Sequence, residues 1–418
     1  MNEKLLQFIW QFQYFNTGEL ETTDQERLQI LKPGFSNQHQ GPDFTDAKIK
    51  IHNTHWAGNI EIHVCTSDWL KHGHQNDSNY NNVILHVVWK NDIQFPNIPV
   101  LELCNRVPGL LLQKYKELMN QSNFIPCESN LQTVHELTWK NWKTRLVAER
   151  LERRGETVTR FLGQNNYHWE ETYWSLLARN FGYMVNADAF ESIARSIPVK
   201  ILARHRNNIL QTEALLIGQA GLLEKAYKDD YPLQLKDEYV YLKKKYKLKT
   251  VHIPLHFLRM RPGNFPTLRL SQLAMLVTRS HHHFSKIIAM PPLAEVIQAF
   301  DVAASEYWDS HYRFDQSSRY KKKKIGPSMI RNIIINTLCP VFYAYGDFHN
   351  DSRYKDRAIG FLEQTKAEIN TVLKKFMHLG LENKTAFDSQ SLMELKKQYC
   401  NLKNCLNCSI GNSILRAY

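Results

Sequence analysis

GPDFTDAKIKIHNTHWAGNIEIHVCTSDWLKHGHQNDSNYNNVILHVVW, residues 41–89, is the stretch that decides the fold. Apolar and polar residues alternate over 46–52 and again over 59–65, which is the period-two pattern of β-strands. The two segments therefore predict a hairpin, with its turn at the Trp-Ala-Gly sequence of residues 56–58.

The residues that follow predict further strands of the same sheet. Residues 82–89 form an apolar, β-branched run that is typical of a strand covered on both faces, and residues 100–104 predict one more strand. Between the hairpin and this run, residues 67–74 predict a short helix that begins at Ser67 or Asp68 as its N-cap.

Three polar residues of this region predict a cation site. Side chains alternate across a strand, so Glu61 and His63 share one face, toward the side on which Asp43 lies just before the preceding strand. Carboxylate oxygens suit Mg²⁺ or Mn²⁺, ions that bind substrate phosphates through their remaining positions. The trio therefore indicates phosphodiester chemistry. The alternative is a turn-forming aspartate and an ordinary surface pair on a half-exposed strand.

Histidines are concentrated in the same region. With His63, the additional candidate ligands are His52, His55, His72, His74 and Asp77. Three protein ligands and one open position would suit a hydrolytic zinc ion. A supporting role for His72, His74 and Asp77 around a phosphate or nucleic acid, and simple polar loop residues, are the alternatives.

The composition describes a soluble globular protein. The chain has 418 residues, of which 43% are hydrophobic and 22% charged, and this length predicts more than one domain. No apolar run is long enough to cross a bilayer, and the N-terminus lacks the pattern of a signal peptide, so we expect a cytoplasmic protein without membrane contact. Seven cysteines then indicate reduced thiols.

The charge favours anionic partners such as nucleic acid. The net charge is +12 and the pI about 9.2. Basic residues recur in three groups: Arg145, Arg150, Arg153 and Arg154; residues 243–249; and residues 320–324. We expect Arg261, Arg269, Lys322 and Lys323 to contact the phosphate backbone, although solvated helix faces, or a buried ion pair of Arg261 or Arg269 with Glu213, would also explain them.

The second part of the chain predicts helices. From residue 137 onward apolar residues recur at helical spacing, which indicates packed helical hairpins. We therefore predict an α+β protein with an α/β domain at 1–125 and a large all-α domain at 126–418.

The C-terminal segment carries a possible metal site. Cys400, Cys405 and Cys408 are spaced C-x4-C-x2-C, which in a reduced compartment favours Zn²⁺ or an iron–sulfur cluster. A fourth ligand is not evident from the spacing. Cys339 is a candidate, and the remaining cysteines are scattered at 65, 104 and 127.

The N-terminal motif resembles the core of the PD-(D/E)XK nucleases. Pro42-Asp43 followed by Glu61-Ile62-His63 matches the positions of the family's metal-binding carboxylates. The resemblance implies a restriction-endonuclease-like core, Mg²⁺ or Mn²⁺ at Asp43 and Glu61, and an accessory carboxylate that Glu3 could supply. The family's lysine is replaced by His63, so the resemblance implies that His63 acts in its place as a catalytic residue and candidate base, or that Lys48, Lys50 or Lys71 reaches the site, or that the core is degenerate.

A second resemblance covers nearly the whole chain. The sequences GPDFTDAKI, WAGNIEIHVCTSDWLKHGH, EALLIGQAG (213–221), RPGNFPTLRLSQLA (261–274) and YCNLKNCLNCSIG (399–411) occur in the order found in the bacterial domain of unknown function 2851 family, mainly from Bacteroidetes-type organisms. This resemblance implies no established activity.

Three classes of function therefore remain open. The first is a metal-dependent nuclease in which a basic helical domain grips the substrate backbone. The second is a non-catalytic nucleic-acid-binding protein with a degenerate nuclease core, and the third is a protein-interaction scaffold.

Overall fold

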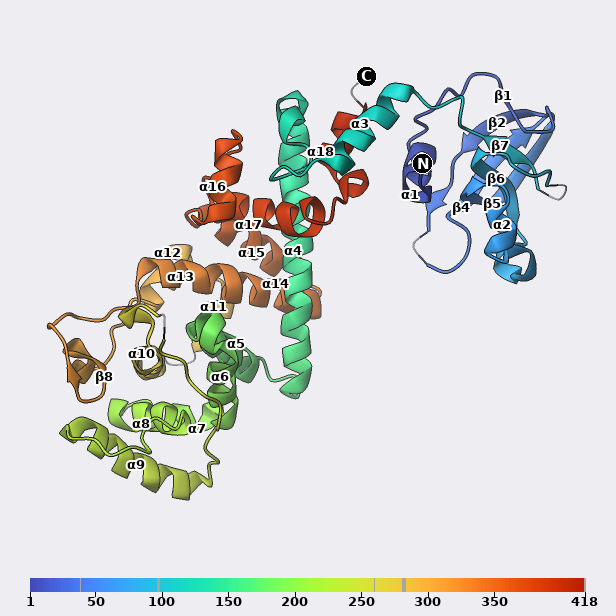
Figure 1. Cartoon of the computed structure of the whole chain (residues 1–418). Helices are drawn as coiled ribbons and strands as arrows, with labels where there is room; N and C mark the ends of the chain where they lie inside the picture. Colours follow the sequence, from blue (N-terminus) through green and yellow to red (C-terminus); the bar gives the residue numbers. More distant parts are fainter. Residues whose placement is uncertain (38, 96–97, 259, 280–282, 417–418) are drawn as a thin grey trace. The chain divides into compact units, whose positions relative to one another are not determined.

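The computed structural model of the chain (Figure 1) describes residues 1–37, 39–95, 98–258, 260–279 and 283–416. The architecture is α+β, as the sequence predicts, with a mixed sheet and flanking helices near the N-terminus and a large helical region after it. Two compact units result: unit 1 is Met1–Trp142 with Leu395–Tyr418, and unit 2 is Lys143–Glu394. From the sequence we expected a boundary at residue 125, with the C-terminal cysteines in the helical domain. In the structure these cysteines belong to unit 1.

A seven-stranded mixed sheet occupies the described part of unit 1. The main order is β1-β2-β4-β5-β6-β7, and β3 pairs with β4. Pairing is antiparallel from β1 to β5, whereas β6 runs parallel to both β5 and β7. The strands are β1 (Leu20–Glu21), β2 (Arg27–Lys32), β3 (Phe35–Ser36), β4 (Phe44–Ile51), β5 (Thr54–Cys65), β6 (Val83–Lys90) and β7 (Val100–Glu102). β6 is buried at six consecutive positions, which confirms a strand covered on both faces.

The β4–β5 hairpin forms as predicted, but the predicted turn is wrong. His52, with φ of +48°, and Asn53 connect the strands, and residues 56–58 lie inside β5. Gly58 serves a different purpose, because a Cβ there would lie 2.5 Å from Cγ2 of Ile84 in the next strand. The glycine therefore permits close approach of β6 and does not form a turn.

Short helices flank this sheet. α1 (Glu3–Gln11) is capped by the Asn2 side chain and packs on β5 through its apolar face. The crossover from β5 to β6 consists of α2 (Asp68–Lys71), η1 (His74–Asn76) and η2 (Ser78–Tyr80). Ser67 is the N-cap of α2 by position, without a side-chain capping bond.

The remainder of unit 1 combines segments from both ends of the chain. It contains α3 (Gly109–Asn120), η3 (Glu128–Thr133), the beginning of α4 (Glu136–Gln164), the π-turn η7 (Leu395–Cys400), η8 (Cys405–Asn407) and α18 (Ser409–Arg416). α18 packs against both α3 and η3.

Unit 2 is built from helices around one hydrophobic core. Besides the rest of α4, it contains α5 (Trp169–Phe181), α6 (Tyr183–Ser196), α7 (Val199–His205), α8 (Ile209–Gln219), α9 (Asp230–Tyr246), η4 (Pro262–Asn264), α10 (Pro266–Arg279), α11 (His283–Ile288), α12 (Leu293–Ala299), η5 (Glu306–Asp309), β8 (His311–Arg313), β9 (Gln316–Ser317), α13 (Pro327–Ile333), η6 (Ile334–Leu338), α14 (Cys339–Phe348), α15 (Ser352–Gln364), α16 (Thr371–His378) and α17 (Ala386–Glu394). Large side chains such as Phe181, Phe190, Trp308 and Phe342 are almost completely buried there. None of the described helices combines the length and apolar character needed to cross a lipid bilayer.

Candidate metal site

The strand register brings Asp43 and Glu61 together. Phe44 of β4 pairs with Ile60 of β5, so the residue before Phe44 lies opposite the residue after Ile60. The backbone N–H of Asp43 donates to Glu61 Oε2 at 3.1 Å, and the N–H of Ile62 donates to Asp43 Oδ2 at 3.1 Å. The two carboxylates expected to share an ion are therefore neighbours on one face of the sheet.

Burial makes this pair of acids unusual. Burial, followed by the charge of Asp43, raises the pKa of Glu61 to about 9. Burial also raises the pKa of Asp43 to about 6, although a hydrogen bond from Gln7 Nε2 at 2.8 Å opposes the shift. Ionising both groups is costly in the absence of a cation, and a bound cation would remove that cost.

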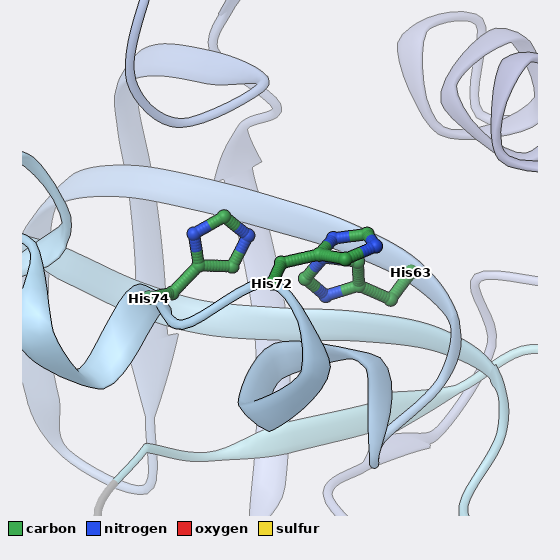
Figure 2. A group of neighbouring side chains, drawn as sticks. All are labelled: His63, His72 and His74. Carbon is green, nitrogen blue, oxygen red and sulfur yellow. The ribbon is translucent and has the colours of Figure 1, made fainter.

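His63, His72 and His74 are neighbouring side chains (Figure 2), and two of them, His63 and His74, contact the Glu61 carboxylate. Glu61 Oε1 lies 3.5 Å from His63 Nε2 and 3.4 Å from His74 Nε2. His63 Nε2 lies 3.1 Å from His72 Nδ1, and the potential ligand atoms of the three histidines are all within 4.8 Å of one another. Glu61 and His63 are buried rather than paired on an exposed face, which excludes the surface-pair interpretation.

His86 and two aromatic residues hold these rings in place. His63 Nδ1 lies 2.9 Å from His86 Nε2, and His86 is opposite Glu61 in the parallel register of β5 and β6. Tyr80 stacks on His74 with ring centroids 3.8 Å apart, and Trp69 contacts His74 edge-on at 5.3 Å. His86 is not among the residues predicted from sequence, although a histidine inside an otherwise apolar strand signals that a polar partner is buried beside it.

The buried imidazoles are neutral at physiological pH. Burial, together with the neighbouring histidines, lowers the pKa of His63 to about 3 and that of His86 to about 4. Burial also lowers the pKa of His74. Neutral imidazole is the form that binds metals, and His63 can offer Nε2 when its Nδ1 proton is donated to His86.

The geometry of these donors fits a divalent transition metal. Donors that share one metal at about 2.1 Å lie roughly 3.0–3.4 Å apart, and the pairwise distances of 3.1, 3.4 and 3.5 Å given above are close to this range. His74 Nε2 is also buried without a hydrogen-bond partner, so it is free to bind an ion. Imidazoles beside a carboxylate suit Zn²⁺ or Mn²⁺ better than Mg²⁺, which prefers oxygen ligands.

Comparison with known proteins places the chain in a family. Residues 3–371 match the family model described as "Protein of unknown function (DUF2851)". The chain belongs to the DUF2851 family. The match contains the whole candidate metal site and Cys127, whereas Cys400, Cys405 and Cys408 lie beyond it. No curated protein and no solved structure matches this DUF2851 chain.

Several other side chains expected near the site have different partners in this DUF2851 chain. Asp77 accepts from the backbone N–H of Asn79 and caps η2. His52 lies 3.7 Å from Glu26 beside the hairpin turn, and His55 is near the same end of β5, roughly 26 Å along the strand from His63. His52 and His55 therefore do not belong to the group formed by His63, His72 and His74.

The lysines and Glu3 were alternatives for the missing motif lysine and for an accessory carboxylate. Lys71 donates to Asp68 at 2.6 Å and is 64% exposed. Lys48 and Lys50 face the solvent side of β4, opposite to its buried positions. Glu3 raises the pKa of both Asp43 and Glu61, so it is the residue of this group whose charge acts at the site.

Two of the four predicted phosphate-contacting residues are buried, which contradicts that assignment. Arg269 lies in α10, is 5% exposed, and donates to Gln272 and Asn264 rather than to Glu213. Lys323 is also 5% exposed, and its ammonium donates to the backbone carbonyls of Trp308 and Asp309. Both cations satisfy groups inside unit 2. Arg261 and Lys322 are exposed.

Proposed function

We propose that this protein is a metal-dependent hydrolase of phosphodiester bonds in nucleic acid. The observation that carries the proposal is the convergence of Asp43 and Glu61 with His63, His72 and His74 on one face of the sheet. Carboxylates and neutral imidazoles gathered around a common point are the donors that hydrolytic metal sites use.

The chain order around the site supports this proposal. α1, the antiparallel strands β4 and β5, the crossover helix α2 and the parallel strand β6 follow the order that a PD-(D/E)XK core requires. Asp43 precedes one strand and Glu61 lies within the next, as do the metal-binding carboxylates of PD-(D/E)XK nucleases. The proposed resemblance of unit 1 to a PD-(D/E)XK core depends on this order of elements and on Asp43 and Glu61.

The residues divide into different roles. Glu61, His63, His72 and His74 would hold Mn²⁺ or Zn²⁺, with Mg²⁺ as the weaker fit, and Asp43 would share or orient the ion. The metal would polarise a phosphoryl oxygen and lower the pKa of a water molecule. His63 is 1% exposed with its pKa lowered to about 3, so the expected role as a general base does not suit it, and we assign it to binding. His72 is the exposed imidazole of the group and can contact a substrate.

The charge of the chain supports a polyanionic substrate. The net charge of +12 favours binding to a phosphate backbone, and Arg261 and Lys322 are exposed cations of unit 2. Such binding should weaken steeply with salt, because each phosphate contact releases counterions.

A cleavage assay tests the proposal. Single-stranded, duplex and branched DNA and RNA are incubated with Mg²⁺, Mn²⁺ or Zn²⁺ in turn. Asp43→Asn and Glu61→Gln should reduce cleavage to background while leaving nucleic-acid binding within a few fold. Glu21→Gln, at an exposed position of β1, is the matched control and should leave cleavage nearly unchanged.

The same assay separates the alternatives. Salt-sensitive binding without cleavage under every metal would favour the non-catalytic nucleic-acid-binding protein, for which His63 at the lysine position is the supporting observation. If the protein neither binds nor cleaves nucleic acid, the protein-interaction scaffold is the remaining interpretation.

A further inference from the structure

The C-terminal cysteine segment lies against the segment that contains Cys127. Lys396 donates to the carbonyl of Phe124, three residues before Cys127, and Lys403 donates to the carbonyl of Met119. α18 also packs on η3, whose N-cap position is Cys127. Two stretches separated by more than 270 residues in sequence are thus neighbours within unit 1.

The backbone presents the four thiols of this region from short turns. Cys400 ends η7, and Cys405 begins η8, where the N–H of Cys408 donates to the Cys405 carbonyl at 3.2 Å. All four cysteines are reduced and buried, with between 6% and 9% of each residue exposed. A C-x2-C turn joined by two further thiols is a common arrangement for binding a metal through sulfur.

Gly411 allows η8 and α18 to lie close together. A Cβ on Gly411, in the first turn of α18, would lie 2.3 Å from the carbonyl oxygen of Cys405. Only a residue without a side chain allows α18 to begin directly over η8.

The four thiols act on one another electrostatically. After burial, the largest causes that raise the pKa of Cys127 to about 12 are Cys408 and Cys405. Burial followed by Cys127, Cys408 and Cys405 likewise raises the pKa of Cys400. The buried thiol of Cys339 in unit 2 is different, since burial alone raises its pKa. The packing gives the same grouping: Cys127 is at the N-cap of η3, against which α18 packs, whereas Cys339 lies in unit 2.

Two cations lie where a negatively charged thiolate centre would need them. Burial raises the pKa of Cys400 and Cys405, and the charges of Lys396 and Lys403, respectively, oppose part of that rise. Four thiolates around Zn²⁺, or around a cubane iron–sulfur cluster, carry net negative charge, which neighbouring ammonium groups stabilise.

We propose that Cys127, Cys400, Cys405 and Cys408 are the four ligands of one thiolate-bound metal centre. Its occupant is Zn²⁺ or an iron–sulfur cluster, the two species that bind four cysteine thiolates in a reduced compartment. The centre ties the chain just before α4 to the C-terminal segment. It is independent of the proposed hydrolase activity, because none of its ligands belongs to the candidate metal site on the sheet.

Metal analysis of the full-length protein tests the proposal. Zinc, iron and acid-labile sulfide are measured on protein purified with and without exclusion of air. We expect about one zinc per chain, or about four iron and four sulfide with the visible absorption of a cluster. Cys127→Ser should lose this metal as completely as Cys400→Ser, whereas Cys339→Ser and Cys104→Ser should retain it. His72→Ala should also retain it, which separates the cysteine centre from any ion bound by the histidines.

A second measurement covers the case in which Cys127→Ser fails to fold. In the wild-type protein, a thiol reagent followed by mass spectrometry should find all four cysteines protected together and released together after chelation or oxidation. Cys127→His, which keeps a zinc ligand, should fold and retain zinc if zinc is the occupant. Full metal content in Cys127→Ser would overturn the proposal. So would wild-type protein without zinc or iron in which chelators leave the reactivity of Cys127 unchanged.

Discussion

Replacing Glu61 with glutamine should stabilise the metal-free protein while removing its response to metal. Glutamine has the shape of the protonated carboxyl, and its carbonyl oxygen can still accept the hydrogen bond from the Asp43 backbone. What it cannot do is ionise among buried groups. The variant therefore separates the electrostatic cost of this carboxylate from its packing.

The size of the effect follows from the Glu61 pKa. The pKa rises from an ordinary 4.5 to about 9 on folding, so the folded chain holds this proton more tightly than the unfolded chain. The resulting stabilisation is complete below pH 4.5 and is lost as the pH rises through about 9. At pH 7 the free energy of unfolding is therefore about 3 kcal/mol lower than it is below pH 4.5. For a unit of this size this difference corresponds to roughly 6–12 °C in Tm.

Thermal unfolding in the presence of a chelator measures this prediction. The Tm difference between Glu61→Gln and the wild type should be small at pH 5 and should grow in favour of the variant toward pH 8. Added Mn²⁺ or Zn²⁺ should raise the Tm of the wild type but not that of the variant. Glu21→Gln, on the exposed side of β1, is the control and should behave as the wild type. A variant that unfolds at or below the wild-type temperature at pH 8, or that metal stabilises equally, would refute the reasoning.

Three further changes test the packing and charges of both units. Gly218→Ala would place a Cβ 2.2 Å from the ring of Tyr239 and should destabilise unit 2 by about 1–3 kcal/mol, measured by urea unfolding. Arg153→Met removes hydrogen bonds of 2.6 and 2.8 Å to the Glu394 carboxylate, which is 2% exposed, and should cost about 2 kcal/mol in the same assay. His86→Ala removes a buried partner of the histidine group and should weaken metal binding roughly 10–100-fold by calorimetry.

Local periodicity explains why most of the sheet was predictable from sequence. The strands β4, β5 and β6 lie where alternation and apolar runs placed them, because these patterns report directly which faces are buried. The hairpin turn was misplaced because Trp-Ala-Gly contains a glycine. That glycine is needed for the contact of β5 with β6, which is a tertiary requirement that the local sequence does not reveal.

For the candidate sites as well, the local sequence reveals only those groupings of side chains that do not depend on tertiary contacts. Asp43, Glu61 and His63 were predictable because their grouping depends on strand alternation within one hairpin. His86 and Cys127 were missed because they join their groups only through pairing with distant segments. Arg269 and Lys323 were misassigned to the surface because charge patterns do not show that a cation is buried against carbonyl and amide oxygens.

The buried polar groups of the two units predict different responses to metal removal. Within the described residues of unit 2, Glu394 pairs with arginines and Glu213 accepts hydrogen bonds from Tyr231 and Trp308, so the protein itself supplies partners for both side chains. In unit 1 burial raises the pKa of Glu61 and of Cys127, and the neighbouring Asp43 or the neighbouring thiols of Cys408 and Cys405 contribute to the rise. Such groups are stabilised by cations that bind only the folded state. A chelator should therefore lower the unfolding temperature of unit 1 and leave that of unit 2 unchanged, as hydrogen exchange at increasing temperature would show. Equal loss of protection in both units would contradict this account of where metal stabilises the chain.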